Sequence, residues 1–121
     1  MGFECLNGFP GPFIKFMLEK MSPKEFYDMC ADRKKFNAKL FCVYGLTGGP
    51  LGDEIKLFEG IIDGNVVEPR GSSSFKVSFD TFFEPFGQNK TFGEMTDKEK
   101  DLCSYRAAAF RQLKAFLEKF Y

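Results

Sequence analysis

One stretch decides the fold of this chain: Leu6-Asn7-Gly8-Phe9-Pro10-Gly11-Pro12-Phe13-Ile14-Lys15. Proline fixes φ and glycine permits left-handed backbone, so two of each within five residues predict a sharp, constrained loop. The apolar run that follows predicts the first turns of a helix; it comprises Phe13, Ile14, Phe16 and Met17. A loop held this tightly indicates that the segment positions a neighbouring group.

Length and charge limit the class of protein. At 121 residues the chain forms one domain or a piece of one. Lysine plus arginine equals aspartate plus glutamate at 17 each, so no charge excess favours nucleic acid or an anionic membrane. No apolar run reaches the roughly 18 residues that a membrane span needs. We therefore expect a cytoplasmic protein with no nucleic-acid and no membrane partner.

Cysteine and histidine usage argues against two kinds of site. The four cysteines, Cys5, Cys30, Cys42 and Cys103, form no C-x-x-C pair, and the chain has no histidine. This composition argues against zinc. Since there is also no signal-peptide pattern, it argues against a secreted disulfide framework, and we expect free buried thiols.

The first third of the chain predicts an aromatic core and two short helices. Seventeen phenylalanines without tryptophan indicate a core of packed rings, with nearly every phenylalanine buried. Periodicity predicts one helix from Pro12 to about Lys20. Ser22-Pro23-Lys24-Glu25 is a capping box with proline at the first helical position, which predicts a second helix.

The middle of the chain predicts an antiparallel meander of three strands. Ala38 to Leu46 is apolar on both faces, which is typical of a strand inside a covered sheet. Glu54 to Ile62 is expected to return antiparallel after a glycine-rich turn. Asp63-Gly64-Asn65 predicts a tight turn into a short third strand, Val66 to Glu68.

The end of the chain predicts one short and one long helix. Thr96-Asp97-Lys98-Glu99 is a second capping box, which opens a short helix that ends before Ser104. Tyr105 to Phe120 is expected to be a long amphipathic helix. Its predicted buried stripe consists of Ala109, Phe110, Leu113, Phe116, Leu117 and Phe120. The element order gives an α/β class, a mixed sheet with an antiparallel meander flanked by helices.

Four segments, in this order along the chain, resemble signature motifs of the inosine triphosphate pyrophosphatase (Ham1-like) family. They are the opening loop, Pro69-Arg70-Gly71, Val77 to Phe83 and Met95 to Arg106. The ordered set spans nearly all of the chain and is far more specific than any one motif. The resemblance implies that residues 1–121 form a single partial domain, the C-terminal part of the ITPase-like (Maf/Ham1) fold.

The family resemblance also implies an activity and a base pocket. Members hydrolyse non-canonical purine nucleotides (ITP, dITP, XTP) to the monophosphate and pyrophosphate, with Mg²⁺ bound in the complete fold. Phe79 can stack on a purine, Asp80 can accept a ring N–H, and Arg106 can donate to the 6-oxo group that adenine lacks. Lys100 suits a nearby anionic or carbonyl oxygen. The implied pocket residues are Val77, Ser78, Phe79, Asp80, Lys100, Ser104, Tyr105 and Arg106.

The chain departs from the family pattern in two ways. Tyr105 stands where the family has histidine, and Val77, Ser78 and Thr81 stand where it has an aromatic residue, glycine and proline. In addition, nothing here matches the family's phosphate-holding loop or its metal-binding acids. Met1 falls on the last residue of the family's Glu-Asp-Thr/Ser-Gly/Ser-Leu segment, so we expect a truncated chain with no catalytic residue or metal site of its own.

Three functions stay open from the sequence. The chain is the nucleotide-site half of a pyrophosphatase, or a catalytically inactive nucleotide-binding or dimer-partner protein, or a protein-interaction module. Since the family's other strands belong to the same sheet, we expect an uncovered sheet edge and exposed apolar surface. We therefore expect a homodimer or other self-association.

Overall fold

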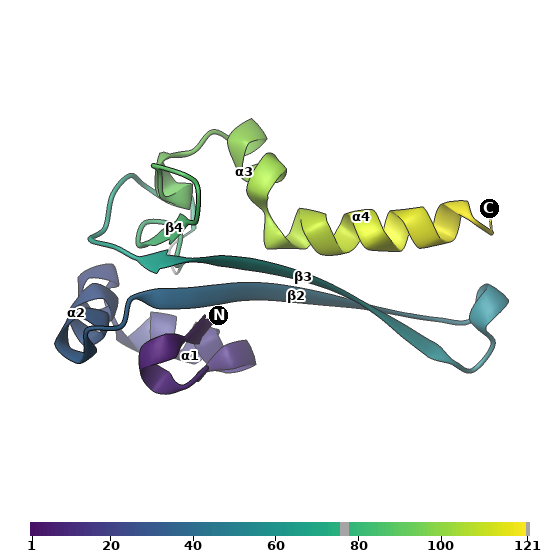
Figure 1. Ribbon diagram of the computed structural model, residues 1–121, viewed down its shortest axis with the longest axis horizontal. Coiled ribbons are helices and arrows are strands. Elements are labelled where there is room, and N and C mark those ends of the chain that lie inside the picture. Colours follow the sequence, from purple (N-terminus) through teal and green to yellow (C-terminus); the bar gives the residue numbers. More distant parts are fainter. Residues whose placement is uncertain (76–77, 121) are drawn as a thin grey trace.

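The computed structural model describes residues 1–75 and 78–120 and shows an α/β fold built on one long hairpin (Figure 1). Four strands form an antiparallel sheet in the order β1-β2-β3-β4. The strands are β1 (Gly2–Phe3), β2 (Asn37–Thr47), β3 (Ile55–Val66) and β4 (Phe83–Pro85). The α-helices are α1 (Ile14–Lys20), α2 (Pro23–Arg33), α3 (Asp97–Cys103) and α4 (Tyr105–Glu118). The α/β class with antiparallel strands and flanking helices is confirmed.

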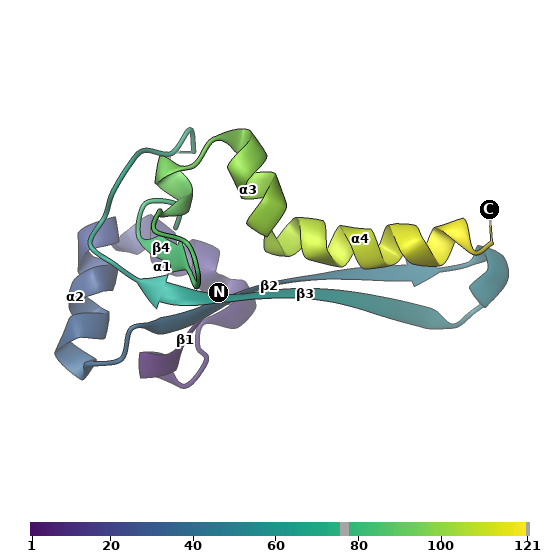
Figure 2. The ribbon, with the colours of Figure 1, turned by 45° about the horizontal axis from the view of Figure 1, so that its top comes forward.

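The hairpin of β2 and β3 sets the shape of the molecule. The two strands pair continuously from Asn37↔Asn65 to Thr47↔Ile55. The strands β1 and β4 are short and pair only near one end, at Ala38 and Lys39 of β2 and at Gly64 to Val66 of β3. Helix α4 runs along the hairpin towards its tip, while α1 and α2 lie at the other end (Figures 1 and 2). We call the end that holds β1, β4, α1 and α2 the head, and residues 43–59 the arm.

The core of the head is a stack of aromatic rings. The rings of Phe3, Phe26 and Phe82 are fully buried and stack in series, with centroids 5.6 and 4.8 Å apart. Phe83 and Phe92 stack beside them at 5.6 Å. The prediction that nearly every phenylalanine is buried is wrong, because eight are more than a third exposed. These are Phe9, Phe13, Phe16, Phe41, Phe75, Phe86, Phe110 and Phe120.

Local signals located the helices well. Both predicted capping boxes form: Ser22 Oγ accepts from the Glu25 N–H, and Thr96 Oγ1 accepts from the Glu99 N–H, with each glutamate bonding back. These reciprocal bonds satisfy backbone donors that a helix start leaves open. The first predicted helix begins as a 3₁₀ turn at Gly11–Phe13 before α1. None of the helices described in residues 1–75 and 78–120 is long and apolar enough to span a bilayer.

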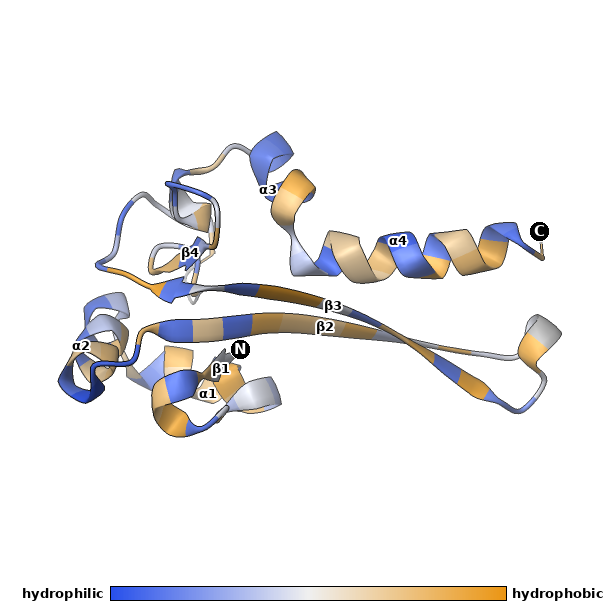
Figure 3. Ribbon diagram, viewed as in Figure 1, coloured by the Kyte–Doolittle hydropathy of each residue, from blue (hydrophilic) through white to orange (hydrophobic). Residues whose placement is uncertain are grey.

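The expectation of a strand covered on both faces is wrong. Along β2, burial alternates: Ala38 and Leu40 are buried, while Phe41 is 38% and Val43 48% exposed. Helix α4 covers one face of the hairpin, and the other face is open. The β2–β3 register and their exposure place Phe41, Val43, Leu57 and Ile61 on that open face. Figure 3 shows that both strands contain hydrophobic segments. We call these four residues the open apolar face.

The predicted turn at Asp63-Gly64-Asn65 is also wrong. Strand β3 continues through these residues to Val66, so no separate third strand begins there. Gly64 is required by packing, since a Cβ there would lie 2.5 Å from the Glu84 carbonyl oxygen and from the Phe83 ring. The glycine therefore marks a close approach of β4, which sequence pattern alone cannot distinguish from a turn.

The buried stripe of α4 is narrower than predicted. Ala109 and Phe116 are buried, and Leu113 and Leu117 are half-buried. Phe110 and Phe120 are 52% and 51% exposed, so their assignment to the stripe is wrong. A two-stranded hairpin is too narrow to cover a broad helix face, which leaves the flanking rings in solvent.

Candidate functional site

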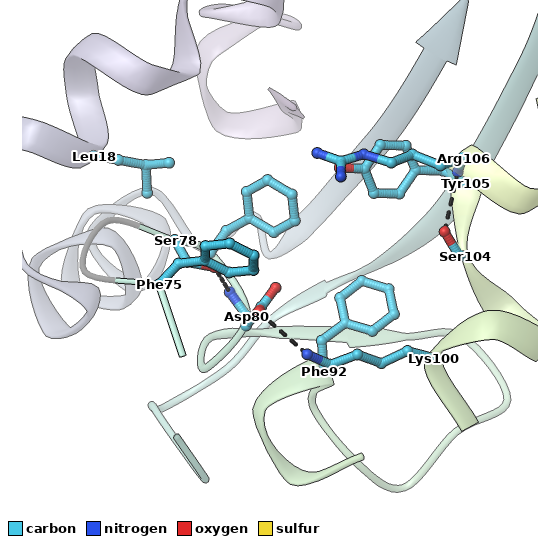
Figure 4. Close-up of a pocket in the computed structure, with 10 residues that line it drawn as sticks. Leu18, Phe75, Ser78, Asp80, Phe92, Lys100, Ser104, Tyr105 and Arg106 are labelled. Carbon is cyan, nitrogen blue, oxygen red and sulfur yellow. Dashed lines mark hydrogen bonds and ion pairs between the residues drawn. The ribbon is translucent and has the colours of Figure 1, made fainter. Parts of the chain in front are cut away.

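The head contains a cavity of about 350 Å³ where the loop before β4, helix α3 and the start of α4 meet (Figure 4). Ten residues line it: Leu18, Phe75, Ser78, Phe79, Asp80, Phe92, Lys100, Ser104, Tyr105 and Arg106. The lining combines aromatic rings with two cations and one carboxylate. This composition is typical of a site for a flat ligand with a polar edge.

The start of α4 is fixed by its cap and by the strand beneath it. Ser104 Oγ accepts hydrogen bonds from the backbone N–H groups of Arg106 and Ala107. Under the helix, a Cβ on Gly60 would lie 2.0 Å from the Tyr105 carbonyl oxygen. Glycine at this point of β3 therefore lets α4 approach closely enough to hold Tyr105 and Arg106 at the cavity.

The loop on the opposite wall is held by an ion-pair network. The Arg70 guanidinium pairs with Glu84 and, through Nε, with Glu94 at 3.3 Å. Buried Thr91 donates from Oγ1 to the Arg70 carbonyl oxygen at 2.8 Å. Gly71 has φ +81°, and a Cβ there would lie 2.3 Å from the Gly93 carbonyl oxygen. Pro69-Arg70-Gly71 thus supports the cavity from behind without lining it.

Asp80 is the carboxylate of the cavity and is 14% exposed. Its Oδ2 accepts from Ser73 Oγ at 3.2 Å and pairs with Lys100 Nζ at 3.4 Å. Its backbone is fixed as well, because its N–H donates to Ser78 Oγ and its carbonyl oxygen accepts from the Gly93 N–H. No group in the described part of the chain hydrogen-bonds to Oδ1. That oxygen can accept a donor from a ligand.

The aromatic side of the cavity is formed by Phe79 and Tyr105. Their ring centroids lie 6.3 Å apart at 50°, and the Arg106 guanidinium carbon lies 5.6 Å from the Tyr105 ring (Figure 4). Burial raises the pKa of the Tyr105 phenol above its usual value of 10.0, and the Arg106 charge only partly opposes this shift. The phenol is therefore neutral and able to donate throughout the physiological pH range.

Comparisons with known proteins identify the family of this chain. The chain matches the sequence model of the Ham1 family over residues 1–116. It belongs to the Ham1 family. It is 42% identical over 118 residues to the inosine triphosphate pyrophosphatase of Schizosaccharomyces pombe, covering 98% of this chain and 61% of that protein. The enzyme of the same name from Neurospora crassa is 38% identical, with 97% and 59% covered.

Solved structures of Ham1 proteins show the same fold. The Staphylococcus aureus Ham1 protein superposes with a TM-score of 0.83 at 25% identity, covering 99% of this chain and 64% of that one. A Coxiella burnetii Ham1 protein has a TM-score of 0.81 at 22% identity, covering 98% and 63%. The chain thus spans less than two thirds of the length of these relatives.

The residues implied by the Ham1 resemblance come together in one place. Seven of the eight line the cavity: Ser78, Phe79, Asp80, Lys100, Ser104, Tyr105 and Arg106. Val77 lies outside the described residues. Sequence reasoning missed Leu18, Phe75 and Phe92, which reach the cavity from other segments. Only Phe92 carried a usable signal, a third capping box formed by Thr91 and Glu94 around it.

A second cavity of about 380 Å³ adjoins the first and shares Phe79, Tyr105 and Arg106 with it. Its far side is formed by Met1, by Gly11 and Pro12 of the opening loop, and by Leu40, Phe41 and Val43 of β2. The peptide bond Phe9-Pro10 in that loop is cis. The opening loop therefore helps to form the second cavity but does not line the first.

The Mg²⁺ that the Ham1 resemblance implies has no set of ligands in the described residues. Residues 1–75 and 78–120 hold no group of three histidine, cysteine, aspartate or glutamate side chains placed to bind one ion. Oxygen ligands gathered around the cation are what Mg²⁺ requires. The described side chains therefore do not fit this cofactor.

Proposed function

We propose that this chain binds the base of a non-canonical purine nucleotide in the cavity between the loop at Asp80 and the start of α4. The observation that carries the proposal is that one cavity is lined by an aromatic face, a half-buried carboxylate and two cations. Its volume of about 350 Å³ lies within the usual range for small-molecule sites. Support also comes from relatives named inosine triphosphate pyrophosphatase.

The proposed pose follows from the chemistry of hypoxanthine. The ring N–H donates to Asp80 Oδ1, while Lys100 holds Oδ2 at 3.4 Å and keeps the carboxylate in place. The 6-oxo group accepts from a cation on the α3–α4 side, and we assign this donor role to Arg106, which lines the cavity. Adenine has a donor at position 6 and an acceptor at N1, so both contacts would be mismatched. The rings of Phe79 and Tyr105 provide the stacking surface.

We further infer that pyrophosphate release belongs to a longer protein and not to this chain by itself. Metal-assisted hydrolysis requires carboxylates that hold a divalent cation against phosphate oxygens. No such set exists among the residues described. The 121-residue chain should therefore bind inosine monophosphate and show no magnesium-dependent release of pyrophosphate from inosine triphosphate. Robust turnover would overturn this part of the proposal.

We also propose that the chain self-associates through the open apolar face. On this face Leu57 is 60%, Ile61 54% and Val43 48% exposed, and exposed apolar side chains of this kind favour association. Glu59, which pairs with Val43 in the register, is a charged residue on the same face. A catalytically inactive dimer partner, the alternative function, would use the same surface. Sedimentation of the natural chain should show dimers or larger species. Val43→Lys should shift it towards monomers, whereas Lys24→Glu on α2 should not.

Nuclear magnetic resonance tests the base site directly. Adding inosine monophosphate should shift the backbone amide signals of Lys100, Ser104 and Tyr105. The signals of Leu46 and Lys56 in the arm provide the control and should stay in place. Shifts spread evenly over the head and the arm, or no shifts at millimolar ligand, would contradict the proposal.

A further inference from the structure

Two cysteines outside both cavities lie next to each other in the core of the head. Cys5 is in the 3₁₀ turn Glu4–Leu6, and Cys30 is in the last turns of α2. Their Sγ atoms are 3.7 Å apart although the residues are 25 positions apart in sequence. Cys5 is 7% and Cys30 0% exposed, and both are free thiols.

The backbone on both sides of this pair is fixed by other contacts. The Cys30 carbonyl oxygen accepts the N–H of Lys35, which closes the end of α2. The Arg33 guanidinium donates to the Cys5 carbonyl oxygen at 3.5 Å. Phe3 lies two residues before Cys5 and Phe26 lies one turn before Cys30, and their rings stack on each other. The two sulfur atoms are therefore held opposite each other by the fold.

We propose that Cys5 and Cys30 form an oxidative modification site, at which a hydroperoxide converts the two thiols into an intramolecular disulfide. The Cys5 sulfur attacks the peroxide oxygen and becomes a sulfenic acid, and water leaves when the peroxide is hydrogen peroxide. The Cys30 sulfur then attacks Cys5 Sγ, forms the S–S bond and releases a second water. Two thiols are oxidised by two electrons in total, and one peroxide is reduced to two waters.

The order of these steps follows from the different burial of the two thiols. Cys5 is 7% exposed and Cys30 is 0% exposed, so we assign the first attack on the peroxide to Cys5. Burial and the neighbouring Cys5 raise the pKa of the Cys30 thiol to about 12. Cys30 thus stays a thiol at neutral pH and is a poor nucleophile towards the peroxide. In the second step its proton passes to the departing hydroxyl of the Cys5 sulfenic acid as the S–S bond forms.

The other two cysteines provide an internal comparison. Cys42 and Cys103 are half-buried and therefore easier for a small oxidant to reach. Cys103 Sγ lies 3.7 Å from Met95 Sδ and 3.3 Å from the Glu99 carbonyl oxygen, so its neighbour is a thioether and not a thiol. Exposure alone would favour modification of Cys42 and Cys103. Proximity favours a cross-link between Cys5 and Cys30.

A cross-link here would close a loop that contains the opening glycine-proline segment and α1. Closing a loop of this length restricts the unfolded chain and stabilises the folded one. The oxidised protein should therefore unfold at a higher temperature than the reduced protein. Dithiothreitol should reverse the shift.

Peptide mapping of the full chain tests the site. Protein with Cys42→Ser and Cys103→Ser is treated with hydrogen peroxide, quenched, alkylated and digested, in buffer and in guanidinium chloride. In buffer, a peptide pair joined through Cys5 and Cys30 should accumulate, two hydrogens lighter than the reduced peptides. The wild-type chain should give the same pair in buffer and a mixture of pairings in guanidinium chloride.

The matched control is Cys30→Ala, which should leave Cys5 unable to cross-link. If this variant does not fold, the comparison of wild-type protein in buffer and in guanidinium chloride still decides. Cys5 and Cys30 that both remain alkylatable while Cys42 or Cys103 is oxidised would overturn the proposal. So would a native cross-link of Cys5 to any cysteine other than Cys30.

Discussion

The head and the arm use the same hairpin in opposite ways. In the head, β2 and β3 are flanked by β1 and β4, and aromatic stacks and the ion-pair network around Arg70 hold the cavity loop. In the arm, the two strands have α4 on one face and open apolar side chains on the other. One end of the sheet therefore supports a cavity with aromatic and charged walls, whereas the other end exposes apolar side chains to solvent.

The largest expected effect comes from removing a ring from the head. Phe26→Ala deletes the central ring of the Phe3–Phe26–Phe82 stack and should lower the free energy of unfolding by about 3–5 kcal/mol. Phe110→Ala removes a ring that is 52% exposed beside the arm and should cost less than about 1 kcal/mol. Urea denaturation measures both. Equal losses would show that the arm is as tightly packed as the head.

Gly60 and Gly45 test how closely α4 packs on the hairpin at two different points. Gly60→Ala would place a Cβ 2.0 Å from the Tyr105 carbonyl oxygen, which should displace the start of α4 and cost about 1–3 kcal/mol. Gly45→Ala meets only Leu57 Cδ2 at 3.6 Å and should change stability by less than about 0.5 kcal/mol. If Gly60→Ala were as well tolerated as Gly45→Ala, the conclusion that α4 packs closely on β3 at Gly60 would be wrong.

Asp80→Asn tests the acceptor role of the carboxylate at almost constant volume. The affinity for inosine monophosphate should fall roughly tenfold, because a charge-assisted hydrogen bond is lost. Asp63→Asn changes a carboxylate that pairs with Lys39 on the open side of the sheet and should leave the affinity unchanged. Calorimetric titration measures both variants. A similar loss in the two would indicate a general effect of charge.

Alkaline pH should lower the free energy of unfolding, because the buried Cys30 thiol resists ionisation in the folded state. The folded state raises the pKa of this thiol from 9.0 to about 12, so the folded chain binds more protons than the unfolded chain in that interval. Stability is therefore fully present below pH 9 and is lost as the pH rises towards 12. The raised pKa of Tyr105 acts in the same direction. Cys30→Ala should reduce this slope in urea titrations, and an unchanged slope would refute the assignment.

The smallest effect is expected at the cap of α4. Ser104→Ala removes the side chain that accepts from two backbone N–H groups and should cost about 1 kcal/mol. Since the same cap fixes the start of the helix, nucleotide affinity should fall along with stability. Ser22→Ala removes the cap of α2 and should cost a similar amount of stability without a loss of affinity. Thermal unfolding and calorimetry separate the two outcomes.

Local signals in the sequence predicted the helices, and ordered motifs predicted seven of the ten residues that line the cavity. Capping boxes at Ser22 and Thr96 form where they were expected because a cap depends on only four neighbouring residues. Seven residues from two distant segments meet in the cavity, which no periodicity in the sequence could show. The resemblance to the Ham1 family predicted that these two segments contribute to one site.

The errors share a physical cause, which is tertiary contact. Asp63-Gly64-Asn65 has the composition of a turn, but Gly64 is a strand residue that makes room for β4. Ala38 to Leu46 is apolar on both faces, but one of those faces is open. Leu18 and Phe75 reach the cavity only through the path of the whole chain. None of these features leaves a local pattern in the sequence.

The proposed base site should distinguish a 6-oxopurine from adenine. Calorimetry with inosine monophosphate and adenosine monophosphate measures it most directly, because the two ligands differ only at N1 and position 6 of the base. We predict that the inosine nucleotide binds at least roughly tenfold more tightly and that Arg106→Ala reduces this preference. Equal affinities, or a preference that Arg106→Ala leaves unchanged, would contradict the proposed base site.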